Sequence, residues 1–176
     1  YTYPLFYEDQ NRSHIGIDNH LHLSEVDLPR ASVAYTHCLL LDIKNFYPSI
    51  YTHSIAWALD PETVQAGGCI CTYKTKCTPH SKDYFPNKFD RLVRSLDRRR
   101  TKGIPIGPFT SDVISEILLR RIDKKTSEYA LEKDIPFIGF RYKDDYFLFT
   151  NSYEHADKIR KQMQKYLNDF HLEVNE

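Results

Sequence analysis

Residues 137–149 read FIGFRYKDDYFLF, and this stretch decides the fold of the chain. Two runs rich in aromatic and apolar residues flank a charged break, a pattern that predicts a β-hairpin with Asp144 and Asp145 at or just past its tip. Adjacent carboxylates repel each other, and folding gains nothing from such a pair. A divalent cation bound by both would stabilise them. The hairpin therefore predicts that Asp144 and Asp145 hold a metal ion.

A second predicted strand also ends on an acid. Residues 36–43 read THCLLLDI, and the continuous apolar run in this segment is typical of a strand buried on both faces. Asp42 closes the run ahead of a turn that contains Pro48, so its carboxylate can point into a cleft beyond the sheet; a helix or turn cap is the alternative interpretation. If the hairpin lies beside this strand, all three aspartates converge. Three carboxylates suit two Mg²⁺ ions that serve phosphoryl transfer.

The helical segments complete the predicted fold. Apolar residues recur at helical spacing over about 55–59, 89–96, 110–122 and 154–169. Thr52 or Ser49 is the predicted N-cap of the first of these helices, and Thr110 or Ser111 that of the third. Strands and helices in this order predict an α+β fold, in which an antiparallel or mixed sheet carries helices on one face.

The loop that precedes the third helix reads GIPIGP over residues 103–108. Two glycines and two prolines in six residues predict a rigid backbone that lacks a side chain at two points. Another molecule can approach the main chain of such a loop closely.

Composition narrows the class of protein. The chain has 176 residues, 41% of them hydrophobic and 14% aromatic, which is enough for one packed domain or for one domain and a fragment of another. It does not begin with methionine, so we expect a piece of a longer protein. It lacks an apolar run of the roughly 20 residues that a membrane span needs.

The chain has 24 basic and 24 acidic residues, and this zero net charge counts against a nucleic-acid binder, whereas local basic clusters count for one. The clustered residues are Arg91, Arg94, Arg98, Arg99, Arg100, Lys102, Arg120, Arg121, Lys124 and Lys125.

Residues from about 60 to 90 are predicted to be an insertion, because proline and glycine interrupt them repeatedly. The insertion contains Cys69, Cys71, Cys77 and His80. Three thiols and an imidazole can enclose a structural Zn²⁺ ion, although free thiols are the favoured interpretation because the spacing fits no common zinc-finger pattern. This cysteine content does not form a secreted disulfide framework and favours a reducing cytosol.

Three segments together resemble the sequence motifs of reverse transcriptases. LDIKNFYPSI, residues 41–50, resembles motif A; GIPIGP and the helix after it resemble motif B; and YKDD followed by YFLF resembles motif C. The amino-acid sequence of residues 49–59 and 103–123 is most similar to that of the bacterial abortive-infection and defence-associated reverse transcriptases. The resemblance covers roughly residues 36–150.

This resemblance implies a fold and a domain organisation. The expected fold is the palm of a right-hand polymerase, an antiparallel sheet of the RRM or ferredoxin-like type with helices on one face, together with part of the fingers and without the thumb. Residues 1–35 are expected to be an N-terminal segment related to the fingers. Residues 36–176 are expected to form the palm, with the cysteine-bearing insertion inside it.

Site residues follow from the same resemblance. Asp42 and Asp144 are expected to ligate two catalytic Mg²⁺ ions, with Asp145 beside them and the backbone carbonyl of Ile43 on the metal that arrives with the nucleotide; Mn²⁺ is the alternative metal. Tyr47 occupies the position that excludes a 2′-hydroxyl, so deoxynucleotides are the expected substrate. The full set of expected nucleotide contacts is Phe46, Tyr47, Lys102, Gly103, Pro105 and Gly107, and the expected primer or template contacts are Tyr142 and Lys143. Lys102 departs from the family pattern, in which glutamine is common, and offers charge to phosphate instead.

The implied function is RNA-directed DNA polymerisation in a bacterial cytoplasm, in antiphage defence. The nucleotidyl group of a dNTP would pass to a primer 3′-hydroxyl, with RNA as template or structured partner and DNA as product. Whether the protein forms a homo-oligomer or binds a partner protein is left open. Three alternatives also stay open: template-independent or protein-primed synthesis by the same site, RNA synthesis, which the bulk of Tyr47 disfavours, and a non-catalytic nucleic-acid-binding module.

Overall fold

The computed structural model describes residues 2–6, 33–60 and 85–175, with the backbone alone for residues 2–6. The chain divides into two compact units. The first contains Tyr1–Lys44, Ile122–Asp169 and Glu173–Glu176, and the second contains Asn45–Arg121 and Phe170–Leu172.

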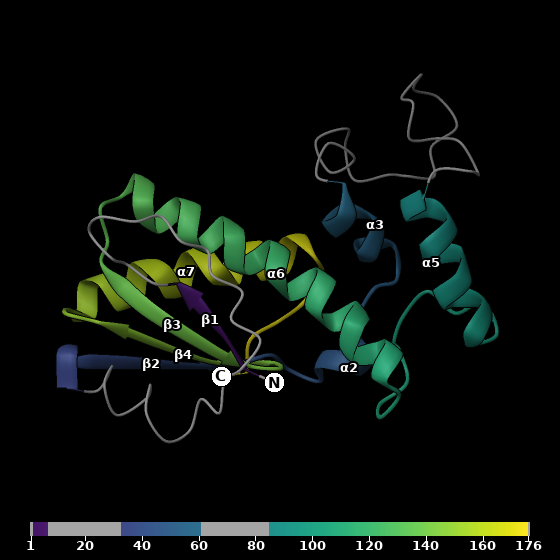
Figure 1. Ribbon diagram of the computed structural model, residues 1–176, viewed down its shortest axis with the longest axis horizontal. Coiled ribbons are helices and arrows are strands. Elements are labelled where there is room, and N and C mark those ends of the chain that lie inside the picture. Colours follow the sequence, from purple (N-terminus) through teal and green to yellow (C-terminus); the bar gives the residue numbers. More distant parts are fainter. Residues whose placement is uncertain (1, 7–32, 61–84, 176) are drawn as a thin grey trace. The chain divides into compact units, whose positions relative to one another are not determined.

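The first unit is built on a four-stranded antiparallel sheet with the strand order β1-β3-β4-β2 (Figure 1). The strands are β1 (Thr2–Phe6), β2 (His37–Asp42), β3 (Phe137–Tyr142) and β4 (Asp145–Thr150). The predicted hairpin is confirmed, because β3 and β4 pair directly and only two residues join them. Strand β1 pairs with β3, so these first residues belong to the same sheet. Most of the remainder of residues 1–35 lies outside the described residues, and their assignment to the fingers stays a prediction.

The register of the sheet sorts its side chains onto two faces. Leu41, Tyr146 and Arg141 are aligned across β2, β4 and β3, and their side chains share one face because directly opposed residues in antiparallel strands point the same way. Helix α7 (Tyr153–Asp169) and the C-terminal half of α6 (Phe109–Glu132) cover this face (Figure 1). The expected arrangement of helices on one face of an antiparallel sheet is therefore present.

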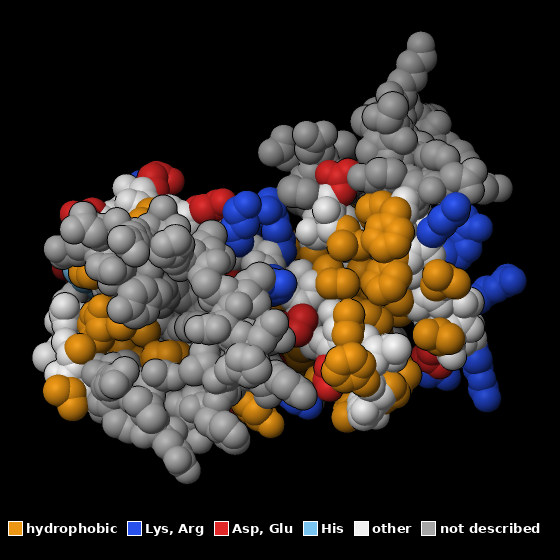
Figure 2. Space-filling view, viewed as in Figure 1, with side chains coloured by type: hydrophobic (Ala, Val, Ile, Leu, Met, Phe, Trp, Pro, Cys, Tyr) orange, Lys and Arg blue, Asp and Glu red, His pale blue; other side chains and the backbone are white. Residues whose placement is uncertain are grey.

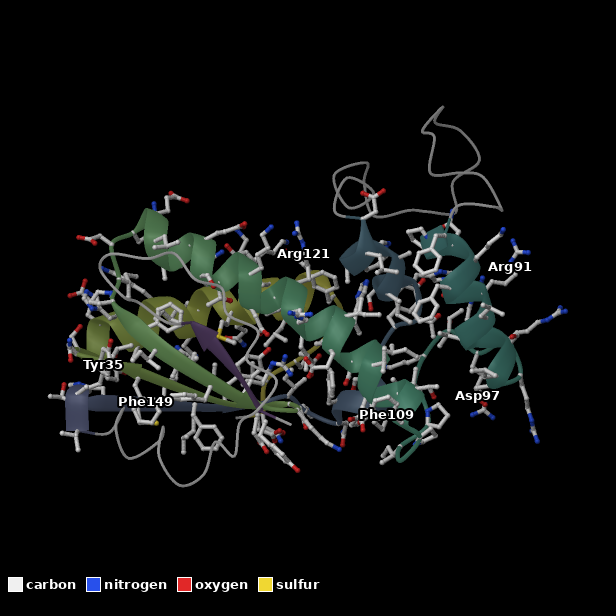
Figure 3. The ribbon with its side chains drawn as sticks, in the orientation of Figure 1. Tyr35, Arg91, Asp97, Phe109, Arg121 and Phe149 are labelled. Carbon is white, nitrogen blue, oxygen red and sulfur yellow. The ribbon has the colours of Figure 1, made fainter. Side chains whose placement is uncertain are left out.

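The opposite face carries an aromatic cluster and the aspartates. The rings of Phe140 and Phe149 meet edge to face with their centroids 6.0 Å apart, and Tyr35 and Phe147 pack against them. Figure 3 shows Phe149 on the side of the sheet away from α6 and α7. Within the described residues, no helix covers this second face, which we call the open face in that sense alone, because Phe140 and Phe149 on it are buried.

The second unit contains α2 (Phe46–Ser49), α3 (His53–Leu59), α5 (Phe85–Leu96) and the first half of α6. Thr52 is the N-cap residue of α3, as predicted, although its hydroxyl makes no capping hydrogen bond. The predicted N-cap of α6 is wrong. The helix begins at Phe109, because the N–H of Ser111 already bonds to the carbonyl of Pro108 at 2.9 Å, so Thr110 and Ser111 lie inside its first turn.

Helix α5 buries only part of the face that its apolar spacing suggests, since Val93 is 7% exposed but other apolar residues are on the surface. Leu92 and Leu96 are 62% and 75% exposed, whereas Asp90 is only 4% exposed. Asp90 is buried because its Oδ2 pairs with His53 Nδ1 of α3 at 2.9 Å and with Arg94 Nε at 3.3 Å. Hydrophobic side chains consequently remain on the surface around α3 and α5, with Lys and Arg at their edge (Figure 2).

The remaining features lie at the limits of the described chain. The possible zinc ligands Cys69, Cys71, Cys77 and His80 lie outside the described residues. Near the end of the described chain, Val174 forms an isolated bridge with Ile43. Among the described helices, none is long and apolar enough to cross a membrane.

Candidate active site

The tip of the hairpin consists of Lys143 and Asp144. Lys143 has a φ of 54°, in the left-handed region that residues other than glycine seldom adopt. Its carbonyl accepts a 2.9 Å hydrogen bond from Nη1 of Arg141, which holds the turn from within β3. Asp144 is half-buried in this turn, and Asp145 is the exposed first residue of β4.

Asp42 lies directly across the sheet from Asp145. The two residues are Cα partners where β2 ends and β4 begins, and Tyr142 is aligned with them on β3. Directly opposed residues bring their Cβ atoms to about 4.5–5.5 Å, and like charges in that position destabilise a sheet. The alignment places the Asp42 and Asp145 side chains on the open face. Within the described residues, no cationic side chain forms an ion pair with Asp42, Asp144 or Asp145.

The surroundings of Asp144 disfavour its charged form. Burial raises the pKa of its carboxyl above the ordinary value, and the negative charges of Asp145 and Asp42 raise it further. A backbone hydrogen bond at Asp144 and the charge of Lys143 act in the opposite direction. The two opposed aspartates at the end of the sheet therefore act on the third, which lies in the turn beside them.

The chemistry of this donor set fits a hard divalent cation. Mg²⁺ prefers carboxylate and carbonyl oxygens, and the three acids supply carboxylates. The carboxylates are not drawn together as tightly as a metal centre would draw them, since no group of three or more His, Cys, Asp or Glu in the described part of the chain lies close enough to hold a metal. Mutual repulsion of this kind is relieved by a bound cation.

A buried polar network supports the hairpin from the helix-covered face. Arg141 is 1% exposed, and its Nε and Nη2 donate to Oδ2 of Asp123 on α6 at 3.2 and 3.1 Å. The hydroxyl of Tyr146 donates to Oδ1 of the same carboxylate at 3.0 Å. Asp123 thus has a donor on each oxygen, and Arg141 still has Nη1 available for the carbonyl of Lys143. The network connects α6 to the turn that carries Asp144.

The segment that follows α7 holds the end of β2. The N–H of Lys44 donates to the carbonyl of Glu173, and the N–H of Asn175 donates to the carbonyl of Asp42, both at 2.8 Å. The bridge between Ile43 and Val174 lies between these two hydrogen bonds. Neither bond uses the N–H or the carbonyl of Ile43. The Ile43 side chain is 2% exposed and anchors the segment in the core.

Several expected nucleotide contacts come together within the second unit. The N–H groups of Gly103 and Ile104 donate to the carbonyls of Ile50 and Tyr47, at 2.8 and 3.0 Å, and Lys102 forms an isolated bridge with Tyr51. The loop that resembles motif B therefore lies against the segment that follows Asp42 in the sequence. Gly103 is required here, since its φ is 89° and an added Cβ would lie 3.3 Å from the carbonyl oxygen of Pro48.

The two aromatic residues in this group differ in exposure. Phe46 is 2% exposed, so its side chain belongs to the core and only its backbone is left to approach a nucleotide. Tyr47 is partly exposed, and its hydroxyl donates a 2.6 Å hydrogen bond to Oδ1 of Asp112 on α6. Pro105, Gly107, Tyr142 and Lys143 are all exposed. Of the two rings, Tyr47 is the one that can meet a sugar.

Comparison with protein families agrees with these features. A family model described as Reverse transcriptase (RNA-dependent DNA polymerase) matches residues 5–176. The chain belongs to this reverse transcriptase family, and its activity is that of a nucleotidyltransferase, an RNA-directed DNA polymerase. No curated protein matches the chain closely enough to count as a relative.

Four residues of the site were missed by the sequence analysis. Arg141 interrupts an apolar strand, and Asp123 follows the buried Ile122 on α6. A charged residue that is buried within an apolar pattern requires a partner, so these two positions were a usable signal for their pairing. Tyr146 looked like one more aromatic strand residue. Asn175 gave no signal, because its partner Asp42 is 133 positions away in the sequence.

Proposed function

We propose that Asp42, Asp144 and Asp145 form the catalytic metal site of a polymerase palm that extends a DNA primer on an RNA template, using Mg²⁺. The observation that carries the proposal is the cross-strand alignment of Asp42 with Asp145, next to Asp144 in the turn. A sheet that served stability alone would gain by pairing or replacing opposed carboxylates. A metal ligand role explains why Asp42 and Asp145 oppose each other on the open face without an ion pair to a cationic side chain among the described residues.

Each part of the chain has a separate task in this reaction. When bound, two Mg²⁺ ions supply charge stabilisation for the attacking 3′-oxygen and for the departing pyrophosphate. Asp42 and Asp144 provide carboxylate oxygens, Asp145 adds negative charge beside them, and the carbonyl of Ile43 is a further oxygen donor. Tyr142 and Lys143, exposed next to the acids, contact the primer or the template.

Selection of deoxynucleotides is assigned to Tyr47. Its ring is partly exposed, and the hydrogen bond to Asp112 fixes its orientation within the second unit. A fixed aromatic ring under the sugar leaves no space for a 2′-hydroxyl. Tyr47→Ala should therefore increase incorporation of ribonucleotides relative to deoxynucleotides, and an unchanged ratio would contradict the assignment.

The motif loop is assigned to the nucleotide and the template base. Lys102 and the backbone of Gly103 are held by bonds to residues 47–51, and Lys102, Pro105 and Gly107 remain exposed. A lysine at position 102 supplies positive charge for the triphosphate. Lys102→Gln should raise the KM for dNTP more than it lowers kcat.

We also propose a role in bacterial antiphage defence, which rests on the similarity of residues 49–59 and 103–123 to defence-associated reverse transcriptases. Synthesis without a template, or primed by a protein, uses the same metal site. Sequencing of the product made with and without candidate template RNA separates these modes. A product of random sequence that forms equally well without RNA would favour untemplated synthesis.

Primer extension by the full-length protein tests the metal site. We expect Asp42→Asn and Asp144→Asn to abolish Mg²⁺-dependent incorporation of a labelled dNTP while the protein remains folded. Asp134→Asn is the matched control, because Asp134 is an exposed carboxylate in the same unit, and it should retain full activity. Wild-type activity in either active-site variant would refute the proposal.

A further inference from the structure

Asn175 is bound to Asp42 at two points. Its backbone N–H donates to the Asp42 carbonyl at 2.8 Å, and its side-chain Nδ2 donates to Oδ2 of the Asp42 carboxylate at 2.5 Å. Carboxylate oxygens accept hydrogen bonds only, so the amide must turn its NH₂ group, not its oxygen, toward Asp42. The side-chain bond thus fixes which part of the amide faces the carboxylate.

The second contact adds something that the backbone contact does not. The backbone bonds of residues 173–175 already attach this segment to residues 42–44. The side-chain bond instead restrains the torsion angle of the Asp42 carboxylate by engaging one of its two oxygens. The other oxygen, Oδ1, is left for a further ligand. Because the amide is neutral, it orients the carboxylate without cancelling the negative charge that a cation requires.

We propose that Asn175 is a positioning residue that holds the Asp42 carboxylate in the orientation needed to bind a divalent cation. The inference rests on the proposed metal site and deepens it. Partners that orient a metal ligand in this way are worth 10–100-fold in metal affinity or activity in other proteins, so an effect of about that size is expected here. The contact also means that the segment after α7 contributes to the site.

Asn168 is a natural control for this role. Lys44, Gln164, Asn168, Glu173, Val174 and Asn175 line one polar hollow beside the end of β2. Asn168 is an exposed amide like Asn175, in the same hollow, but it lies on α7 and makes no hydrogen bond to Asp42. Its removal tests the polarity of the hollow without touching the carboxylate.

The experiment compares Asn175→Ala, Asn175→Leu and Asn168→Ala in the full-length protein. Mg²⁺ is titrated while the melting temperature is followed, which reports metal binding without any reaction. The same titration is then followed by primer extension. We expect both Asn175 variants to need about 10–100-fold more Mg²⁺ for the half-maximal effect in each titration. At saturating Mg²⁺ their kcat should recover, and their KM for dNTP should stay within about twofold of wild type. Asn168→Ala should match wild type throughout.

The outcomes separate this inference from the proposed function. If wild type extends the primer and the Asn175 variants require no more Mg²⁺ than wild type, the inference is overturned and the metal site stands. If Asn168→Ala shows the same shift as Asn175→Ala, the effect belongs to the hollow and the specific contact is refuted. A wild type that neither gains stability from Mg²⁺ nor extends a primer overturns both. A lower melting temperature without Mg²⁺, combined with an unchanged Mg²⁺ requirement, would give Asn175 a structural role alone.

Discussion

The two faces of the sheet treat charge in opposite ways. On the helix-covered face, Asp123 is bonded by both Arg141 and Tyr146, and all three side chains are buried. On the open face, Asp42 and Asp145 oppose each other without a cationic partner among the described residues. Successive residues of one strand lie on opposite faces of the sheet: Arg141 and Tyr146 lie on the helix-covered face, and their neighbours Tyr142 and Asp145 lie on the open face. One face pairs its buried charges, and the other leaves two carboxylates opposed, as the proposed metal site requires.

The largest expected effect on stability comes from breaking the buried pair. Asp123→Ala removes the buried carboxylate that pairs with Arg141 and leaves the arginine charge in the core, which costs about 3–5 kcal/mol of unfolding free energy. Urea unfolding of the metal-free protein measures the change. Glu128→Ala is the matched control on the same helix: its surface pair with Lys124 at 3.8 Å should be worth less than about 1 kcal/mol. Equal losses in the two variants would show that the network does not stabilise this face.

A smaller loss is expected from one hydroxyl of the same network. Tyr146→Phe removes a hydrogen bond to a buried carboxylate and should lower the unfolding free energy by about 1.5–3 kcal/mol. Tyr142→Phe removes a hydroxyl from a tyrosine that is 49% exposed on the open face, and it should change stability by less than about 0.5 kcal/mol. The two denaturation curves compare the faces directly. A larger cost for Tyr142→Phe would invert the comparison.

Replacing the whole network should separate stability from function. In the triple variant Asp123→Leu, Arg141→Met and Tyr146→Phe, none of the three replaced side chains carries a charge, so the unfolding free energy should return to within about 2 kcal/mol of wild type. The carbonyl of Lys143 nevertheless loses its hydrogen bond from Arg141, and the turn that carries Asp144 is released. We therefore expect a folded protein with reduced primer extension. Full activity in this variant would show that the turn needs no support from Arg141.

The smallest expected change is a gain in stability on the open face. Burial is the chief reason that the pKa of Asp144 is raised in the folded state. Above that pKa the ionised carboxylate lowers the free energy of unfolding. This loss of stability disappears as the pH falls below the ordinary aspartate range near 4. Asp144→Asn should accordingly be more stable than metal-free wild type at pH 7, by on the order of 0.5 kcal/mol, with the difference vanishing at low pH. Thermal denaturation in EDTA across this pH range measures it. Added Mg²⁺ should stabilise wild type more than the variant, and a variant less stable at pH 7 would contradict the assignment.

Local patterns were enough to predict the elements that carry the site. The aromatic runs around Asp144 and Asp145 predicted the hairpin, and the apolar run before Asp42 predicted β2, because alternation and short apolar runs reflect the strand itself. The apolar spacing of α5 predicted the helix but only part of its buried face, since Val93 is buried whereas Leu92 and Leu96 are exposed. Spacing indicates which residues share a helix face, but it does not show that this face is buried. In α5, the buried contact is made instead by Asp90 with His53.

The sequence by itself determined the class of chemistry: three acids at strand ends, a glycine-rich loop, and motifs in the order of a reverse transcriptase. Only the tertiary structure decided that Asp42 opposes Asp145, that Asp123 pairs with Arg141, and that the side chain of Asn175 bonds to Asp42. These contacts join residues up to 133 positions apart. Their geometry depends on strand register and helix packing, which arise from the burial of many side chains together. A local pattern contains the residues that need partners, and the packed fold selects which partners they find.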